Sequence, residues 1–227
     1  IEAGYRVLRY DLYGRGYSDR PKNAYTLDLF TRQLRDLLDA LEISDPICLC
    51  GLSMGGPISA TFTARHPERV KKLALFAPVG GSAIPQTLPF KLLSIPGLGE
   101  LLMGLFGEKT LVDGIAEDFY DPKLIDHFTS LYRPQLKLQG FGRAILSTMR
   151  NDALRDSSAV YRLVGETGIP VLLVWGREDK TVPYEQSQEV AASISQAAFH
   201  TIENSGHIPH YENADEVNPI LLQFLQK

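Results

Sequence analysis

A serine between glycines is the residue of this chain best suited to covalent chemistry. The segment 50–56 reads CGLSMGG, which contains the pattern G-x-S-x-G. An apolar run precedes it and a helical pattern follows it, as expected where a strand turns sharply into a helix and exposes a serine hydroxyl. Ser53 is therefore predicted to be a nucleophile. The alternative is a serine that only caps the helix.

The residues around Ser53 fit the same prediction. Gly51 and Gly55 lie two residues to either side, where side chains would collide around a strained turn. The N–H of Met54 is the first donor at the start of the following helix. A helix N-terminus stabilises negative charge, so Met54 is predicted to supply one N–H of an oxyanion hole.

A serine hydroxyl is a weak nucleophile at neutral pH and needs a base. Five histidines are available: His66, His127, His200, His207 and His210. His207 follows a glycine in the loop directly after a predicted strand, and it is the predicted base. His210, three residues further on, is the rival. An ordinary loop histidine is the alternative for each.

The base needs a carboxylate that orients its ring. The loop 175–183 (WGREDKTVP) follows a predicted strand and offers Asp179 and its neighbour Glu178. The loop after the preceding strand reads APVG and contains no acid, which favours Asp179. The alternative is a surface acid paired with Arg177 or Lys180.

The order Ser53, Asp179, His207 is typical of enzymes with such a strand-to-helix serine. Four segments accompany this order of residues: DLYGRGYSDRP, GLSMGG, GREDKTVP and SGHIPHYE. The order and the segments together are specific enough to indicate a family. The sequence resembles the α/β-hydrolase fold superfamily, in its cap-bearing serine-hydrolase branch. The resemblance implies that these three residues form a catalytic triad and that a helical cap covers them.

Hydrophobic patterns place the elements that position these side chains. Apolar runs predict strands at 5–10, 47–52, 70–79, 169–175 and 198–202, and amphipathic patterns predict helices at 26–41, 54–66, 185–194 and 215–226. This alternation predicts an α/β fold with a mostly parallel sheet covered by helices on both faces. Residues 81–165 have no clear strand pattern and are expected to form the cap, inserted between core segments 1–80 and 166–227.

The start of the chain departs from the family pattern. Three strands normally precede the one expected at 5–10, and the loop after the third supplies a second oxyanion N–H. We expect the 227 residues to belong to a longer protein whose remainder pairs between the strands at 5–10 and 47–52. The chain alone is then expected to be unstable or inactive, because buried unpaired backbone groups are costly.

Composition excludes several classes of function. The chain has a net charge of −4 and no basic run, which argues against a nucleic-acid partner. No apolar stretch approaches the roughly 18–20 residues of a membrane span. Cys48 and Cys50 are expected to be buried, reduced thiols, which favours the cytoplasm. No metal or cofactor is expected, since His207 and His210 lack a third ligand and no phosphate or dinucleotide motif is present.

The predicted function is hydrolysis of a carboxylic ester of an apolar small molecule through an acyl-enzyme. A serine rather than an aspartate nucleophile argues against the dehalogenase and epoxide-hydrolase branches. The Leu-, Phe-, Ile- and Met-rich insertion favours an apolar substrate group, or only reflects the cap's own core. Within the resemblance, hydrolysis of a carbon–carbon bond in ring-cleavage products is the alternative. A non-catalytic ligand receptor on the same fold is a third possibility.

Overall fold

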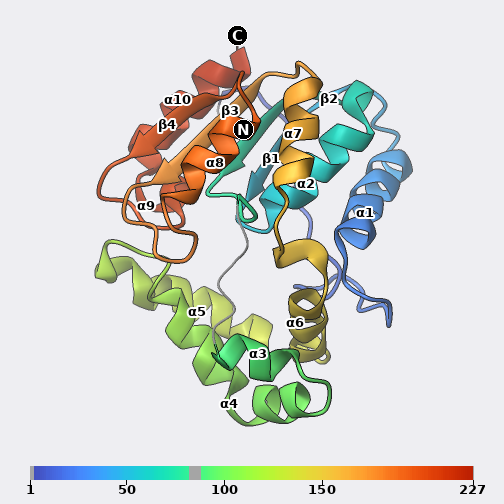
Figure 1. The fold of residues 1–227 in the computed structure, drawn as a ribbon, viewed down its shortest axis with the longest axis vertical. Helices are drawn as coiled ribbons and strands as arrows, with labels where there is room; N and C mark the ends of the chain where they lie inside the picture. Colours follow the sequence, from blue (N-terminus) through green and yellow to red (C-terminus); the bar gives the residue numbers. More distant parts are fainter. Residues whose placement is uncertain (1–2, 82–87, 227) are drawn as a thin grey trace.

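A parallel sheet forms the centre of the molecule in the computed structural model, which describes residues 3–81 and 88–226. In these ranges its strands are β1 (Ile47–Leu52), β2 (Val70–Phe76), β3 (Val171–Gly176) and β4 (Ala198–Ile202), in the order β1-β2-β3-β4. The predicted α/β class with a parallel sheet is confirmed (Figure 1). The carboxyl ends of all four strands therefore meet at one edge.

Six helices of the described ranges surround this sheet. They are α1 (Leu27–Ala40), α2 (Gly55–Arg65), α7 (Ser158–Glu166), α8 (Gln186–Ser193), α9 (Pro209–Glu212) and α10 (Ala214–Gln226), with a 3-10 turn η1 (Pro67–Arg69) before β2. Four match the predicted helices at 26–41, 54–66, 185–194 and 215–226, while α7 falls at the end of the predicted insertion and α9 has no predicted counterpart. Helix α1 begins where the Thr26 side chain accepts a hydrogen bond from the Leu29 N–H. Such a cap satisfies a donor that a helix start leaves without a partner.

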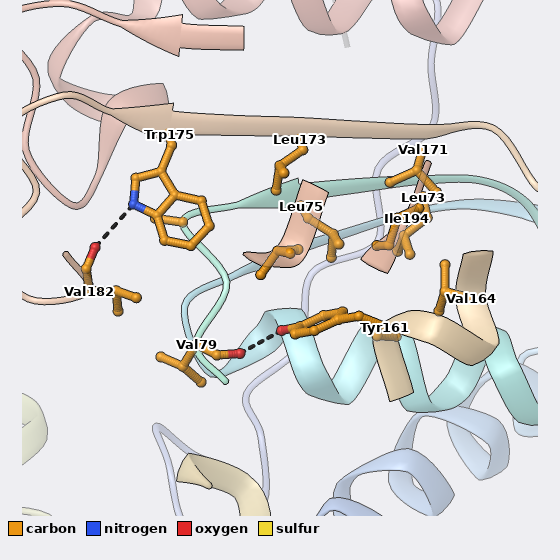
Figure 2. Packing of buried hydrophobic residues seen from close by; sticks show 13 residues of the cluster. Leu73, Leu75, Val79, Tyr161, Val164, Val171, Leu173, Trp175, Val182 and Ile194 are labelled. Atoms are coloured by element: carbon orange, nitrogen blue, oxygen red, sulfur yellow. Dashed lines mark hydrogen bonds between the residues drawn. The ribbon is translucent and has the colours of Figure 1, made fainter. Parts of the chain in front are cut away.

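One face of the sheet packs against α2, α7 and α8. Its core includes Leu73 and Leu75 from β2, Trp175 from β3 and Tyr161 from α7, as Figure 2 shows. The two large polar rings find partners: Trp175 Nε1 donates to the Val182 carbonyl at 3.0 Å, and the Tyr161 hydroxyl donates to the Val79 carbonyl at 2.5 Å. These bonds tie the loops after β2 and β3 to the core.

Helix α10 covers the opposite face, over Ala74, Phe76, Leu172 and Val174. The buried Lys72 of β2 points to this face and donates to the carbonyls of Phe224 and Leu225, both at 2.8 Å. Its charge complements the negative end of the helix. This contact fixes the C-terminal helix against the sheet.

The insertion is helical throughout its described part. It contains α3 (Leu88–Ser94), α4 (Leu98–Ile115), α5 (Ile125–Leu136) and α6 (Phe141–Arg150), with 3-10 turns η2 (Pro122–Leu124) and η3 (Asp152–Leu154). Figure 1 shows α3–α6 as a separate layer beyond one end of the sheet. Helix α7 packs into the core through Tyr161 and Val164. The cap limits 81–165 stay a prediction, part of which lies outside the described residues, and this packing favours an end before α7.

Two expectations are wrong. Residues 5–10 form no strand, and Val7 and Leu8 are exposed. A strand needs a partner for its backbone groups, and in the described ranges β1 is hydrogen-bonded only to β2. The thiols of Cys48 and Cys50 are free but exposed rather than buried. They lie on the face that α10 covers over β2 and β3, where Leu52 is the residue of β1 that packs against the cluster containing α10.

No helix in the described ranges is both long enough and apolar enough to span a bilayer.

The Tyr161 hydroxyl provides a test of this packing. Tyr161→Phe leaves the Val79 carbonyl without its partner in a site with no solvent access. We expect a loss of about 1–2 kcal/mol in the free energy of unfolding, measured by urea denaturation. Tyr17→Phe is the control, since Tyr17 is 88% exposed. Equal stability of Tyr161→Phe and Tyr17→Phe would contradict this account.

Candidate active site

The turn between β1 and α2 holds Ser53 in a strained backbone conformation. Ser53 has φ +52°, a left-handed value that non-glycine residues rarely adopt. Its N–H donates to the Phe76 carbonyl at 2.9 Å, and its carbonyl accepts from Gly56 at 2.8 Å and Val79 at 3.2 Å. The backbone around Ser53 is therefore fixed by the end of β2, by the loop after β2 and by α2. Strain held in this way is typical of functional positions.

Two of the three glycines around Ser53 are required by close packing. A Cβ on Gly51 would overlap the Gly55 carbonyl oxygen and lie 2.6 Å from the Ser59 hydroxyl. A Cβ on Gly56 would overlap Pro78, whereas one on Gly55 would meet nothing within 4 Å. The expectation for Gly51 is therefore supported and the one for Gly55 is wrong. The glycine that the turn needs on the helix side is Gly56.

Met54 is the N-cap of α2, with φ −57° and ψ −28°. Its N–H belongs to the donors that a helix start leaves without intrahelical partners. This position fits the predicted oxyanion donor, a role that stays a prediction.

Asp179 and His207 form a buried pair at the carboxyl edge of the sheet. Asp179 lies in the loop after β3 and is 5% exposed, and His207 lies in the loop after β4 and is 4% exposed. His207 Nδ1 lies 2.8 Å from Asp179 Oδ2. Asp179 Oδ1 accepts from the N–H groups of Thr181 and Val182 at 2.9 and 2.8 Å. Both carboxylate oxygens are thus engaged, and the imidazole has a fixed orientation.

The rival residues are placed elsewhere. Glu178 accepts from the Ser205 N–H at 2.9 Å and does not face the imidazole. His210 packs on the ring of Phe76 with centroids 5.3 Å apart. Burial, and secondarily the nearby His207, lower the pKa of His210. Neither side chain takes the position that the sequence assigns to Asp179 or His207.

Three consecutive backbone amides fix the histidine loop. The Ser205 N–H donates to Glu178 at 2.9 Å, the Gly206 N–H to Glu212 Oε2 at 2.6 Å, and the His207 N–H to the Asp118 carbonyl at 2.7 Å. The other Glu212 oxygen accepts from the Asp121 N–H at 2.6 Å. Glu212 and Asp118 therefore join the histidine loop to the segment that follows α4 in the insertion.

Asp118 places a second carboxylate close to the pair. Its Oδ1 accepts from the Thr181 hydroxyl at 2.6 Å. Burial raises the pKa of Asp118, while the Thr181 hydrogen bond and His207 oppose that rise. Because the Thr181 N–H also binds Asp179, one residue links the two carboxylates. A side chain of the insertion thus takes part in the surroundings of the predicted base.

The Ser53 hydroxyl makes no hydrogen bond to His207 within the described ranges. The structure therefore brings Asp179 and His207 together and places Ser53 at the same edge of the sheet. The hydrogen bond between the Ser53 hydroxyl and the His207 ring is not formed. Such bonds are often long in proteins without a bound ligand. A paired imidazole can take a proton from an alcohol and pass it on.

Sequence reasoning missed Asp118, Thr181 and Glu212. Glu212 ends the segment SGHIPHYE, which also contains the predicted base His207. This short spacing is the sequence feature that could have identified Glu212 as a support of the histidine loop. Asp118 has no local pattern, because its contacts join positions 63 and 89 residues apart.

A parallel sheet, a strained serine after β1 and a buried Asp–His pair after β3 and β4 define an α/β-hydrolase. The chain belongs to the alpha/beta hydrolase family, whose model matches residues 2–220. The resemblance seen in the sequence is thereby confirmed, and the protein is a hydrolase of this family. The catalytic roles of the individual residues stay predictions.

Curated relatives share about 30% of their residues with this chain. A 2-hydroxy-6-oxononadienedioate/2-hydroxy-6-oxononatrienedioate hydrolase of Klebsiella pneumoniae is 31% identical over 246 residues, which cover 100% of this chain and 78% of the relative. A hydrolase of the same name from Pseudomonas putida is 28% identical, covering 99% of this chain and 79% of the relative.

Solved structures confirm the fold. A bromoperoxidase from Bacillus anthracis has a TM-score of 0.83 at 24% identity and covers 100% of this chain and 84% of its own. A meta-cleavage product hydrolase from Pseudomonas fluorescens has a TM-score of 0.76 at 24% identity, with 95% and 78% covered.

Substitutions at the two helix-side glycines test the geometry of the turn. Gly56→Ala forces a methyl group onto Pro78, and overpacking of this kind costs about 1–3 kcal/mol. Gly55→Ala adds the same group in open space, so we expect unfolding free energy within about 0.5 kcal/mol of the parent. Urea denaturation of both variants measures the difference. A Gly55→Ala protein as unstable as Gly56→Ala would contradict the model of the turn.

The pKa of Asp118 makes a second prediction for this site. A carboxyl group whose folded pKa lies above its ordinary value of 3.8 binds more protons in the folded state. Its contribution to stability is therefore present at low pH and falls as the pH rises from about that value through the folded pKa. Asp118→Asn removes this dependence. The stability of the parent relative to Asp118→Asn should fall over that interval.

Denaturation at a series of pH values measures this difference. Asp113→Asn is the control, because Asp113 is an exposed carboxylate of α4 paired with Lys109. A difference between the parent and Asp118→Asn that stays flat or grows with pH would overturn the assignment of a raised pKa.

Proposed function

We propose that this protein is a serine hydrolase that cleaves a carbon–carbon bond next to a ketone in an acidic ring-cleavage product. The observation that carries the proposal is the buried Asp179–His207 pair, 2.8 Å apart, at the same sheet edge as the strained Ser53. The substrate class is supported by the relatives, which match over the whole chain and are named as hydrolases of such acids. An ester substrate, the expectation from sequence, becomes the second candidate.

The nucleophile of the proposed reaction is the Ser53 hydroxyl. Its oxygen adds to the ketone carbon and its proton passes to His207, while Asp179 stabilises the imidazolium. The Met54 N–H stabilises the charge on the carbonyl oxygen. Before this addition, the 2-hydroxyl proton of a 2-hydroxy-6-oxo dienoate moves to the carbon next to the ketone, which gives the 2-oxo tautomer with that carbon saturated. After the addition, the carbonyl re-forms and the carbon–carbon bond breaks. Its electron pair moves through the remaining double bond onto the 2-oxo oxygen, and the dienolate takes up the proton from His207. Water activated by His207 releases the remaining acyl group as a carboxylic acid.

A conjugated acid is a necessary part of this chemistry. A simple carbanion is too basic to leave, but in a 2-oxo tautomer the electron pair is delocalised through a carbon–carbon double bond onto the 2-oxo oxygen, and the leaving group is a dienolate. The 2-hydroxy-6-oxo skeleton in the relatives' names reaches this arrangement when its 2-hydroxyl group ketonises. An ester needs no such help, since an alkoxide is already an adequate leaving group. The same serine, histidine and aspartate serve both reactions, which is why the ester remains the second candidate.

Turnover of matched substrates tests the proposal. The purified protein is incubated with 2-hydroxy-6-oxononadienedioate, and turnover is measured as the loss of the dienolate absorbance of this substrate. A parallel assay uses p-nitrophenyl butyrate. We expect Ser53→Ala and His207→Gln to lower kcat/KM for the acid by about 10³-fold or more. Ser44→Ala, in an exposed loop, is the control and should retain the parent rate.

The outcomes separate the candidates. Faster turnover of the dienedioate supports the carbon–carbon hydrolase, and turnover of the butyrate alone supports the esterase. Binding of the acid without turnover of either compound, and no labelling of Ser53 by a fluorophosphonate, would favour a receptor.

A further inference from the structure

Arg15 is a partly buried cation without an anionic partner. It lies in the segment before α1, and its Nη2 donates to the Thr148 hydroxyl of α6 at 3.0 Å. Its Nη1 is buried and has no hydrogen-bond partner. Buried donors in native proteins nearly always have partners, so an orphan on a guanidinium needs an explanation.

No described carboxylate makes an ion pair or a hydrogen bond with Arg15. Burial lowers the pKa of Arg15, and the described titratable groups that act on it are Tyr132, Tyr25 and Arg20. Arg20 is a second cation, and it donates to the backbone carbonyls of Ser18 and Gly16 rather than to an acid. Two arginines thus lie in this loop without an ion pair to a described acid, while the Asp11 carboxylate of the same loop accepts from the Tyr17 N–H at 2.9 Å.

A second orphan donor lies beside Arg15. Tyr25 is fully buried, and its hydroxyl has no hydrogen-bond partner. The end of its ring lies against the backbone next to Arg15, because a Cβ on Gly14 would lie 2.6 Å from Tyr25 Cε1 and overlap Ala144 of α6. Gly14 itself has φ +80°. The loop is therefore held tightly between Tyr25 and α6, and it places two unsatisfied donors together.

This cluster lies near the predicted triad. Met54, the residue after Ser53, packs against the group of side chains that includes Tyr25 and Ala144. Tyr132 of α5 also lies near this cluster. Burial raises the pKa of Tyr132, the charge of Arg15 opposes this rise, and the charge of Asp118 adds to it. Tyr132 is thus close to both Arg15 and the residue whose carbonyl holds His207. The cluster accordingly lies where α6 of the insertion meets the core, and Met54 connects it to the turn that holds Ser53.

We propose that Arg15 and the Tyr25 hydroxyl bind a carboxylate group of the substrate. An ionised acid would supply the missing anion for Nη1 and accept from the Tyr25 hydroxyl, and hydrogen bonds to charged groups are the stronger ones. The inference rests on the proposed function, since it assigns the recognition of its acidic substrate to two residues. It makes the site selective for an acid over its neutral ester.

Binding to a protein that cannot turn over its substrate tests the inference separately from the chemistry. In the Ser53→Ala background, 2-hydroxy-6-oxononadienedioate and its dimethyl ester are titrated by calorimetry. Adding Arg15→Gln should weaken binding of the diacid about 10-fold or more and leave the diester within about twofold. Arg35→Gln, which removes an exposed guanidinium of α1 paired with Asp36, should change neither.

Tyr25→Phe covers the case in which Arg15→Gln fails to fold, which circular dichroism detects. It keeps the ring packing, removes only the hydroxyl, and should weaken the diacid selectively. Equal loss for diacid and diester, or no loss for either, overturns the inference, as does an absence of diacid binding in the Ser53→Ala background. Selective binding of the diacid with no turnover by the parent protein refutes the proposed function and leaves Arg15 as an anion-binding residue.

Discussion

The Asp179 carboxylate is buried, so the protein must supply all of its hydrogen bonds. Two come from the N–H groups of Thr181 and Val182, and the third partner is the His207 ring. A buried acid without them would be strongly destabilising. Position 176 is a glycine for a related reason, because a Cβ there would overlap the Gly206 carbonyl oxygen, whereas a Cβ on Gly206 would overlap the Asp118 carbonyl oxygen of the insertion. The loops after β3 and β4 can approach closely enough to form the pair only because no side chain lies between them.

The same loops connect the site to the inserted helices. The His207 backbone is held by the Asp118 carbonyl, and Glu212 bridges the Gly206 and Asp121 amides. The imidazole is thus positioned by its own loop and by the insertion together. A movement of the segment after α4 would change the support of His207, so the position of the cap and the geometry of the predicted base are coupled. The Ser53 backbone has other supports, which are the end of β2, the loop after β2 and α2.

The sequence predicted the features that depend on local patterns. The strand at 198–202, the helix at 26–41 and the pairing of Asp179 with His207 follow from apolar runs, helical periodicity and loop order. It failed at 5–10, where an apolar run becomes a strand only with a neighbour to pair with. It also misplaced the critical glycine, because the contact of Gly56 with Pro78 joins two loops. Asp118 and Tyr25 could not be found, since burial and missing partners are properties of the fold.

The charges around the site differ in sign from one side to the other, and this difference bears on the chemistry. Asp118 and Asp179 lie close to His207, and a carboxylate there repels an anion. Arg15 and Arg20 lie in the loop before α1, and neither is paired with a described acid. An acidic substrate entering between these arginines and His207 would be held by its carboxylate at the cationic side. Its uncharged carbonyl would then be the part directed toward His207, so the charge distribution alone would favour one orientation of the substrate.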